Sequence, residues 1–265
     1  MNMKTHIGRA ILAGISLVLI VAVVAAFAQV SSSPTQKLNS PRWSWISENW
    51  TDNDAEYRTI RADIEAQQSQ GTLILPTIER YKGLWEQNPN SPTALFRWAY
   101  ASFRATQQNP PILQKQMILP DAFGKVPSPR TYEYSRLRFL VNAHYFPHSQ
   151  LQALGERLLR HTANDYDVSY YLIDCYRPWE STVEKEKALT LAQSLVRANP
   201  TRSGPYSALG GVYFGLWSVN HQQHDGDDAI KSYREYLSLA PVNDAWRKQA
   251  TKFIKYIEDH KNILR

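Results

Sequence analysis

The chain has 265 residues, of which 43% are hydrophobic and 12% aromatic, so it is long enough and apolar enough to bury a folded core. The formal net charge is +6, but the basic residues are scattered among acidic ones, and we therefore expect no nucleic-acid partner. The single cysteine, Cys175, excludes an internal disulfide and a cysteine-based zinc cluster, and a small buried thiol is expected at this position.

The N-terminal segment is the first predicted element. Residues 10–28 are all apolar or small, and Lys4 and Arg9 precede them. Because about twenty apolar residues cross a bilayer, we interpret residues 1–29 as a signal-anchor that holds the protein to the membrane. A cleaved signal peptide is the alternative, because the end of the segment has the small-x-small form of a cleavage site. The domain that follows is extracytoplasmic in both cases, and it is secreted or periplasmic if the chain is cleaved after Ala28.

Residues 30–50 are predicted to be a polar linker that ends in a tryptophan cluster. The first part of this stretch is polar and contains a proline, as is typical of a linker. Trp43, Trp45 and Trp50 follow it. These side chains can lie in the lipid headgroup layer or cover the open end of the first helix pair. We favour the second interpretation, because the linker carries them away from the membrane.

Residues 51–265 are predicted to be helical, apart from one irregular insertion. Apolar residues recur there at intervals of three and four, which places them on one face of a helix. Polar capping residues, glycine and proline mark where the helices begin and end. The predicted helices run in chain order from about Asp54 to Gly71, Thr72 to Gln87, Pro92 to Arg104, Thr131 to Phe146, after Ser149, from Asp165 to Tyr176, Val183 to Ala198, across Tyr206 to Tyr213, across Ala229 to Tyr236, and after Asp244.

The irregular insertion is expected at about residues 107–130, because proline and glycine recur there. We interpret it as an elaborated surface loop, and the alternative is a functional loop. The run that follows, from Arg130 to Arg138, mixes basic and aromatic residues. We interpret this run as part of a helix with a solvent-exposed polar stripe.

The strongest pattern lies in residues 203–241. One helix carries an aromatic residue, a leucine, a glycine and a tyrosine on one face, and a second carries an alanine, two tyrosines and a terminating proline. These residues are Tyr206, Leu209, Gly210, Tyr213, Ala229, Tyr233, Tyr236 and Pro241. The glycine lets the second helix approach closely. The pattern resembles the tetratricopeptide repeat, a helix-turn-helix unit of about 34 residues that stacks into a solenoid.

The resemblance implies an all-α fold, namely a right-handed α-solenoid of about five helix pairs closed by a C-terminal capping helix. Each pair would leave an apolar face exposed unless a neighbouring pair covered it. Other predicted helices match the same register less completely. Their packing residues would be Leu95, Trp98, Ala99, Leu172, Tyr176 and Ala188.

In this family the first helix of each pair lines a concave groove that holds peptide segments or partner domains, and the resemblance implies the same here. The residues turned away from the packing faces would be Phe96, Tyr100, Phe103, Arg104, Tyr170, Asp174, Arg177, Ser207 and Phe214. Aromatic residues and arginines are typical of contact hot spots. The alternative is that Phe96, Tyr170 and Phe214 belong to the core, because a register error of one residue would turn them inward.

Candidate sites for metal binding or catalysis are few. His221 and His224 lie with an aspartate-rich run in a turn that is about seven residues longer than is usual in this family. Two histidines three residues apart outside a helix are poorly placed to bind a metal ion, so we expect no metal and no cofactor. The sequence contains none of the HExxH, GxSxG, GxxxxGK or GxGxxG motifs, and no catalytic residue is predicted.

The expected function is that of a non-catalytic scaffold, which binds an unidentified protein or peptide in the concave groove on the extracytoplasmic side of a membrane. One alternative is an enzyme, or an accessory domain of one, that uses residues 107–129 as a lid over the groove. Another is a structural protein that associates with itself through exposed aromatic residues. The oligomeric state does not follow from the sequence.

Overall fold

The computed structural model describes residues 50, 54–108, 111–113, 118–145, 151–176 and 181–260. The chain divides into two compact units, Met1–Ser44 and Trp45–Arg265, and all of the described residues belong to the second. The predicted signal-anchor and most of the linker lie outside them. In the part of the chain that is described, no helix combines the length and the apolar character needed to cross a membrane.

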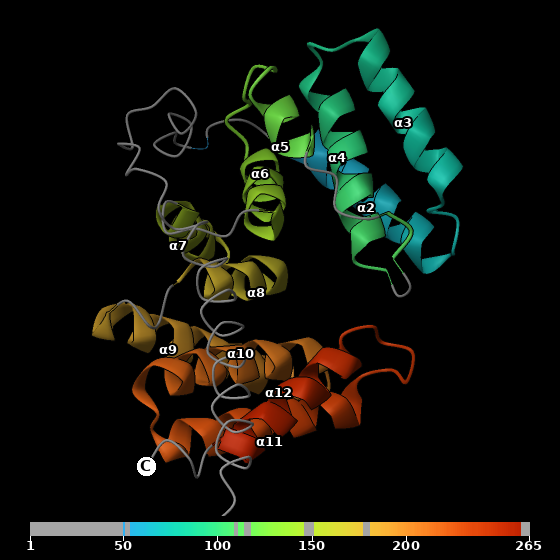
Figure 1. The fold of residues 1–265 in the computed structure, drawn as a ribbon. Helices are drawn as coiled ribbons and strands as arrows, with labels where there is room; N and C mark the ends of the chain where they lie inside the picture. The colour runs from blue at the N-terminus through green and yellow to red at the C-terminus, as the bar shows by residue number, and fades with distance from the viewer. Residues whose placement is uncertain are drawn as a thin grey trace, which may run out of the picture. The chain divides into compact units, whose positions relative to one another are not determined.

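The described part of the chain is all-helical, which confirms the all-α part of the predicted fold class, and no strand occurs in it (Figure 1). Most helices begin and end within a few residues of the predicted positions. Their bounds are α2 Ala55–Ser69, α3 Leu75–Gln87, α4 Pro92–Thr106, α5 Ile118–Phe123, α6 Tyr132–Tyr145, α7 Gln152–His161, α8 Tyr166–Cys175, α9 Thr182–Ala198, α10 Ser203–Asn220, α11 Gln223–Leu239 and α12 Arg247–His260.

Short polar side chains begin several of these helices by accepting a hydrogen bond from the first turn, as helix N-caps do. Ser91 accepts from the amide of Ala94 at 3.2 Å, with a proline at the start of α4. Ser181 accepts from the amide of Glu184 at 3.1 Å at the start of α9. At the other end of α2, Gly71 adopts a φ of 71°, a left-handed conformation that glycine takes without strain. The residues that predict where helices begin and end therefore form N-cap hydrogen bonds or adopt the backbone conformation of a helix end in the structure.

The connection between α10 and α11 is shorter than predicted. Only His221 and Gln222 separate the two helices, because both helices extend into the expected turn. His221 ends α10 in a left-handed conformation with a φ of 53°. His224 lies in the first turn of α11, beside the buried Asp225. The prediction of a turn lengthened by about seven residues was therefore wrong.

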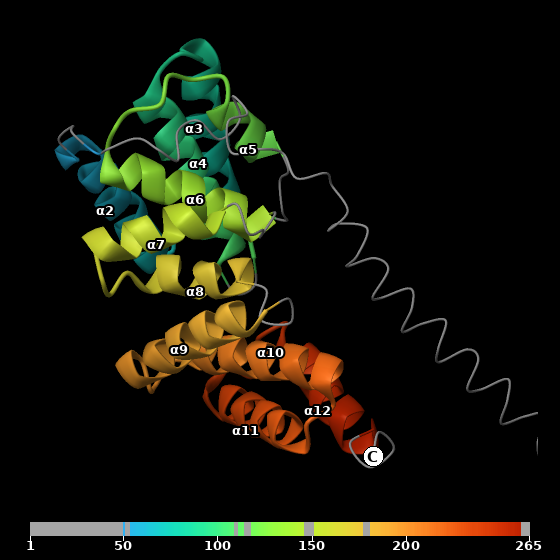
Figure 2. The same cartoon turned by 90° about the vertical axis from the view of Figure 1, so that its left-hand side faces the viewer.

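Helices contact their neighbours in the chain. The structure has contacts between α9 and α10, α10 and α11, and α11 and α12, and α6, α7 and α8 lie side by side (Figure 2). Helices one place apart also contact each other, namely α2 with α4, α4 with α6, α6 with α8, and α8 with α10. The core therefore continues from one helix pair to the next.

Helix α6 is the most deeply buried element. Every residue from Thr131 to Ala143 is buried, because α2, α4, α5, α7 and α8 all contact this helix. The buried set includes the charged residues Glu133, Arg136 and Arg138. The interpretation of this run as a solvent-exposed stripe was therefore wrong. The buried charges have partners instead, as burial in a low-dielectric interior requires.

An ion-pair network joins α6 to the start of α8. Arg136 donates to Asp165 Oδ1 at 3.0 Å and to Asp167 Oδ2 at 2.8 Å. Tyr132 donates its hydroxyl to Asp165 Oδ2 at 3.0 Å, and Asp165 also caps α8 by accepting from the amide of Val168 at 3.1 Å. Burial raises the pKa of Asp165, but the hydrogen bond and positive charge of Arg136 outweigh it, so the pKa lies below its usual value.

Trp50, the last of the predicted tryptophan cluster, lies against α6 and α7. Its indole nitrogen donates to Ser135 Oγ at 2.7 Å. Its ring lies edge-on to Tyr132 and His161, with centroids 5.6 and 5.4 Å away. The guanidinium of Arg157 is 4.6 Å from the ring centroid. The side chain of Trp50 is thus held against α6 and α7.

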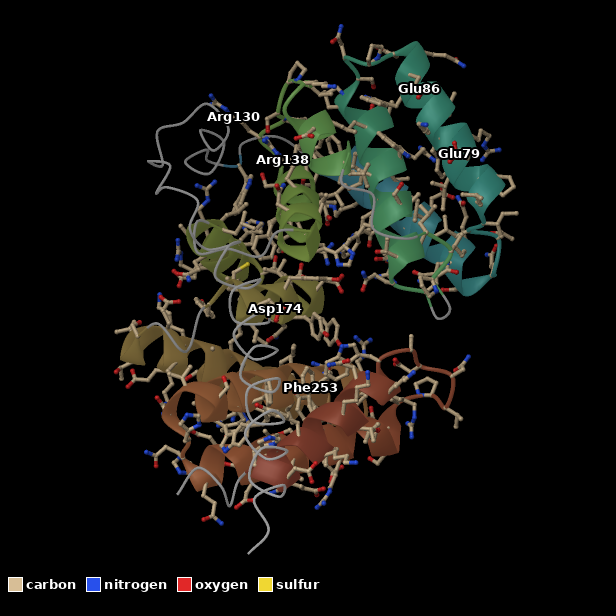
Figure 3. The ribbon with its side chains drawn as sticks, viewed as in Figure 1. Glu79, Glu86, Arg130, Arg138, Asp174 and Phe253 are labelled. Carbon is tan, nitrogen blue, oxygen red and sulfur yellow. The ribbon has the colours of Figure 1, made fainter. Side chains whose placement is uncertain are left out.

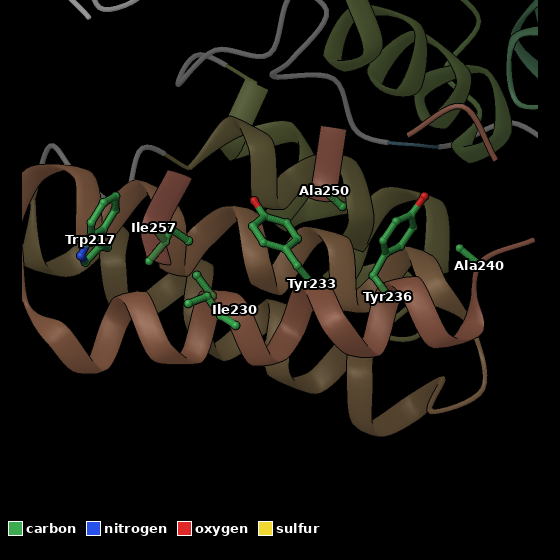
Figure 4. Close-up of a cluster of buried hydrophobic side chains, with 8 residues drawn as sticks. Trp217, Ile230, Tyr233, Tyr236, Ala240, Ala250 and Ile257 are labelled. Atoms are coloured by element: carbon green, nitrogen blue, oxygen red, sulfur yellow. The ribbon is translucent and has the colours of Figure 1, made fainter. Parts of the chain in front are cut away.

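A hydrophobic cluster fills the space between α10, α11 and α12 (Figure 4). Gly210 on α10 faces this cluster, and a Cβ atom there would lie 2.7 Å from the ring of Tyr233. The absence of a side chain at Gly210 therefore sets the close approach of α11 to α10. The buried members are Trp217, Ala229, Ile230, Tyr233, Tyr236, Ala240, Ala250 and Ile257.

Two neighbouring glycines on α10 should respond in opposite ways to alanine. Gly210→Ala should lower the free energy of unfolding by about 1–3 kcal/mol, because the ring of Tyr233 is buried and has no room to move. At Gly211 a Cβ would meet nothing within 4 Å, so Gly211→Ala should raise stability by about 0.5–1 kcal/mol through helix propensity. Urea unfolding of the full-length chain in a mild detergent measures both. Equal effects would contradict the assignment of the two faces.

The Arg136–Asp165 pair should make stability depend on acid pH. Asp165→Asn keeps an N-cap acceptor but removes the charge beside the buried Arg136, and should cost about 3 kcal/mol at neutral pH. Because folding lowers the pKa of Asp165, its contribution is present above the ordinary carboxyl pKa of 3.8 and is lost as the pH falls from there through the lower pKa of the folded state.

Unfolding curves of wild type and Asp165→Asn should therefore differ by a constant amount above about pH 5 and converge as the pH falls below about 4. The exposed Asp259→Asn on α12 is the control, with an expected change within about 0.5 kcal/mol at all pH values. A difference between wild type and Asp165→Asn that persists at the lowest pH would show that the charge is not its source.

Candidate functional site

A hollow between α8 and α10 is the candidate functional site. Its volume is about 300 Å³, and both helices that line it belong to the set predicted to face the groove. Trp246, which precedes α12, closes one side. Asp174 lies on the side of α8 that faces α10 (Figure 3). The lining residues are Tyr170, Ile173, Asp174, Tyr176, Ser207, Ala208, Gly211, Val212 and Trp246.

The wall formed by α8 and α10 carries hydroxyl groups at half-buried positions. The hydroxyl of Tyr170 lies 3.5 Å from Ser207 Oγ, which is a long hydrogen bond. Ser207 also donates to the carbonyl of Gly204 at 2.8 Å. Gly211 is exposed on the same side of α10 and adds no side chain. The hydroxyl groups of Tyr170 and Ser207 therefore lie next to the open space beside Gly211.

Trp246 presents a fixed aromatic surface. Its ring lies edge-on to Tyr236, with centroids 5.2 Å apart, and 5.7 Å from Tyr233. Asp244 accepts a hydrogen bond from the backbone amide of Trp246 at 2.8 Å, which fixes the turn before α12. The residue is nevertheless 37% exposed. One part of the indole is therefore held by the core while another part is open to solvent.

Two ionisable groups of α8, Asp174 and Tyr170, line the hollow. Among the described residues that line it, Asp174 carries a carboxylate and none carries a positive charge. Burial, with smaller contributions from the charges of Asp174 and Asp244, raises the pKa of Tyr170 to about 12, against the opposing effect of the hydrogen bond with Ser207. The hydroxyl of Tyr170 therefore stays protonated at neutral pH and is able to donate a hydrogen bond.

Three of the predicted groove residues lie in the core instead. Phe96, Tyr100 and Phe103 are at most 2% exposed. Phe96 packs against Tyr57 with centroids 5.0 Å apart, and Tyr100 donates to Glu65 Oε1 at 2.7 Å. The physical reason is that α6 contacts α4 and covers the face that the resemblance assigns to the groove. These side chains are not available to a partner.

The other predicted groove residues fall into different places. Arg104 donates to Gln68 Oε1 at 2.7 Å and so links α4 to α2. Phe214 packs against Phe253 with centroids 4.6 Å apart, in the contact between α10 and α12. Arg177 lies outside the described residues. Of the predicted groove residues that the structure describes, it brings together Tyr170, Asp174 and Ser207 in the hollow.

The predicted packing residues mostly face the interior. Tyr206, Leu209 and Tyr213 are half-buried, and Pro241 is exposed just beyond the end of α11. The buried ones are Leu95, Trp98, Ala99, Leu172, Tyr176, Ala188, Gly210, Ala229 and Tyr233. Cys175 is also buried, as expected.

Trp246 is the lining residue that the sequence analysis missed. The sequence analysis predicts a helix after Asp244, and helical spacing alone does not show that one edge of the Trp246 ring stays exposed. A usable signal was its position in a turn, after Pro241 and Asp244, since a large aromatic residue in a connection between helices is often exposed in part. The position of Trp246 in a turn does not predict which neighbouring helix its ring contacts.

The described residues of the insertion lie away from the hollow. Its described helix α5 contacts α4 and α6, and Leu119, Ala122 and Phe123 are buried there. None of the described residues that line the hollow comes from the insertion. In the part of the chain that the structure covers, no three or more His, Cys, Asp or Glu side chains come together as a metal site.

Comparison with known proteins adds no relative. No protein-family model matches the chain, and neither curated proteins nor solved structures provide a match. The resemblance to tetratricopeptide repeats therefore depends on the residues of this chain alone.

Alanine substitutions should separate the core residues from the hollow. Tyr100→Ala should lower the free energy of unfolding by roughly 3–5 kcal/mol, because it leaves a cavity next to Phe96 and an unpaired Glu65. Asp174→Ala should change it by less than about 0.5 kcal/mol, because Asp174 is exposed. Urea unfolding followed by circular dichroism measures both. Comparable losses in the two variants would mean that the hollow is part of the core.

Proposed function

We propose that this protein is a non-catalytic scaffold that binds a segment of a partner protein in the hollow between α8 and α10. The observation that carries this proposal is the hollow itself, where an exposed part of Trp246 lies beside the polar groups of Tyr170, Asp174 and Ser207. Tyrosine and tryptophan are enriched at the centres of protein interfaces, because they combine a large apolar area with a hydrogen-bonding group.

The pattern of helix contacts supports a solenoid of the tetratricopeptide type. If α2 to α11 are grouped two by two, the first helices of the pairs are α2, α4, α6, α8 and α10, and each of them contacts the next. A helix α12 that contacts α11 takes the place of the expected cap. Stacked helix pairs produce such a series, because each pair buries its apolar face against the next.

Gly211 supports a binding role for the hollow. Its position in α10 has room for a side chain, and alanine there would be more stable by about 0.5–1 kcal/mol in a helix. Glycine at this position costs stability but leaves open space beside the helix. This exchange is typical of binding sites, where function and stability compete.

We further propose that residues 10–28 anchor the protein in a membrane, with the helical unit on the extracytoplasmic side. The support is the long apolar run preceded by Lys4 and Arg9. N-terminal sequencing of the mature protein tests this placement. A mature chain beginning at Gln29 would contradict the anchor and favour a secreted or periplasmic protein.

Site-specific photocrosslinking in cells tests the binding proposal. A photoreactive amino acid in place of Ala208, which lines the hollow, should give a light-dependent adduct with a partner protein. The same amino acid in place of Lys252, exposed on α12, should not give that adduct. Adducts that are identical at both positions, or absent at both, would contradict the hollow as the working surface. An adduct between two copies of this chain would favour self-association instead.

A matched pair of glycine variants sharpens the test. Gly211→Leu should fill the hollow and reduce the Ala208 adduct at least about tenfold, since it occupies the space that a ligand needs. Gly83→Leu on α3 is the control, because a Cβ there also meets nothing within 4 Å and the site lies on another helix. Equal losses in both variants would show that the effect comes from the substitution and not from the hollow.

A further inference from the structure

The hollow between α8 and α10 combines hydrogen-bond donors with aromatic rings, and the inference drawn from this combination rests on the function proposed above. Tyr170 and Trp246 line it, together with the apolar side chains of Ile173, Ala208 and Val212. Its volume of about 300 Å³ lies at the small end of ligand pockets, which suits a short stretch of extended chain. We propose that the hollow binds a proline-rich segment of a partner protein in the polyproline II conformation.

Trp246 supplies the first donor. Its backbone amide donates to Asp244 Oδ1, but its indole nitrogen makes no hydrogen bond with the residues that the structure describes. An indole nitrogen donates one hydrogen bond and accepts none. The side chain is 37% exposed, and ring contacts with Tyr233, Tyr236 and Phe253 hold it in place. Trp246 therefore offers a fixed aromatic surface with an unused donor.

Tyr170 supplies the second donor. Its ring stacks on Tyr166 with centroids 6.1 Å apart and lies edge-on to Tyr171 at 5.4 Å, so its position is fixed. Its hydroxyl lies 3.5 Å from Ser207 Oγ, which is a long and therefore weak hydrogen bond. Ser207 donates its own proton to the carbonyl of Gly204. A ligand carbonyl at ordinary distance is a better acceptor for the Tyr170 hydroxyl than Ser207 is.

A polyproline II segment has the acceptors that these donors need. Each proline has a backbone carbonyl but no N–H group, so the bound segment leaves no donor of its own unpaired. The carbonyls are free, because this conformation contains no internal hydrogen bonds. Proline-rich segments bind aromatic-lined grooves in several kinds of domain, and their conformation is formed before binding, which lowers the entropy lost.

Other ligands fit less well. A helical segment has already used its backbone carbonyls within the helix. A purely apolar side chain would take water from Tyr170 and Trp246 without replacing its hydrogen bonds. A charged side chain gains little, because Asp174 already interacts within the protein and none of the described lining residues has a positive charge. A neutral segment that carries carbonyls and flat apolar rings meets all of these conditions.

Peptide titrations of the full-length protein in a mild detergent test this inference. The probes are three capped hexapeptides, namely one of proline only, one of alanine only, and one of alanine with two leucines at its centre. Calorimetry measures their affinities. The protein also carries ¹⁵N in its 8 tryptophans, and Trp246→Phe assigns the indole signal of Trp246. The proline peptide should shift that signal saturably, and each of the other two should bind at least roughly fivefold more weakly.

Variants that remove a donor but keep an aromatic ring test the two hydrogen bonds. Tyr170→Phe and Trp246→Phe should each weaken the proline peptide roughly fivefold in calorimetry, which is the loss expected for one hydrogen bond. Tyr206→Phe is the control, because Tyr206 is also on the helices that form the hollow but does not line it, and its hydroxyl donates to the carbonyl of Pro200. Equal effects of all three variants on the affinity would overturn the inference.

A second pair of variants shows whether binding occurs in the hollow. Gly211→Leu should abolish the shift of the Trp246 signal, because it fills the space beside α10, and Gly83→Leu on α3 should leave the shift unchanged. Proline-peptide binding that persists in Gly211→Leu overturns the inference. Equal or tighter binding of the alanine or the leucine peptide overturns it as well.

The crosslinking experiment separates the two proposals. If the photoreactive group at position 208 captures a partner and Gly211→Leu prevents it, but the proline peptide is not preferred, the binding function stands and the proline-rich ligand is overturned. If neither the adduct nor the peptide shift occurs, both are overturned. If both occur, the captured segment should lose its adduct when its prolines are changed to alanine, and an unchanged adduct would overturn the proline-rich ligand.

Discussion

The ion pair between Arg136 on α6 and Asp165 at the start of α8 is the constraint on which the arrangement of the helices depends. A buried guanidinium is stable only next to acids that satisfy its hydrogen bonds, so α6 and α8 have one permitted register. Asp165 also caps α8, which ties the direction of that helix to the same carboxylate. Because α8 supplies Tyr170 and Asp174, the geometry of the hollow follows from this contact.

The burial of α6 explains why the N-terminal and C-terminal halves of the helical unit differ. In the N-terminal half α6 covers α4, so Phe96, Tyr100 and Phe103 become core residues. In the C-terminal half α8 and α10 contact each other but leave space beside Gly211. Of the predicted groove residues that the structure describes, those that face open space together are Tyr170, Asp174 and Ser207, in the hollow between α8 and α10.

Local features of the fold were predictable from the sequence, and long-range ones were not. Helix positions, caps and the close approach at Gly210 follow from spacing and from the small size of glycine, which act over a few residues. The burial of Arg136 depends on its pairing with Asp165, twenty-nine positions away in the sequence. Helical periodicity relates residues only a few positions apart, so it does not predict this pair. The same difference explains why only part of the site was predicted. The helical spacing within α8 and α10 identified Tyr170, Asp174 and Ser207. Trp246 lies in a turn whose position is set by tertiary packing, so no helical spacing identifies it.

Gly210 and Gly211 are adjacent in the sequence, but each affects a different property: the first affects helix packing and the second affects the size of the hollow. Substitution of the first acts on the contact between α10 and α11, and substitution of the second acts on the open volume beside Trp246. A lineage carrying this chain is able to narrow or reshape the hollow through single changes at the second position while the first stays fixed. Under the proposed function, descendants with different ligands are therefore expected to keep the same helix packing and to diverge first at this one residue of α10.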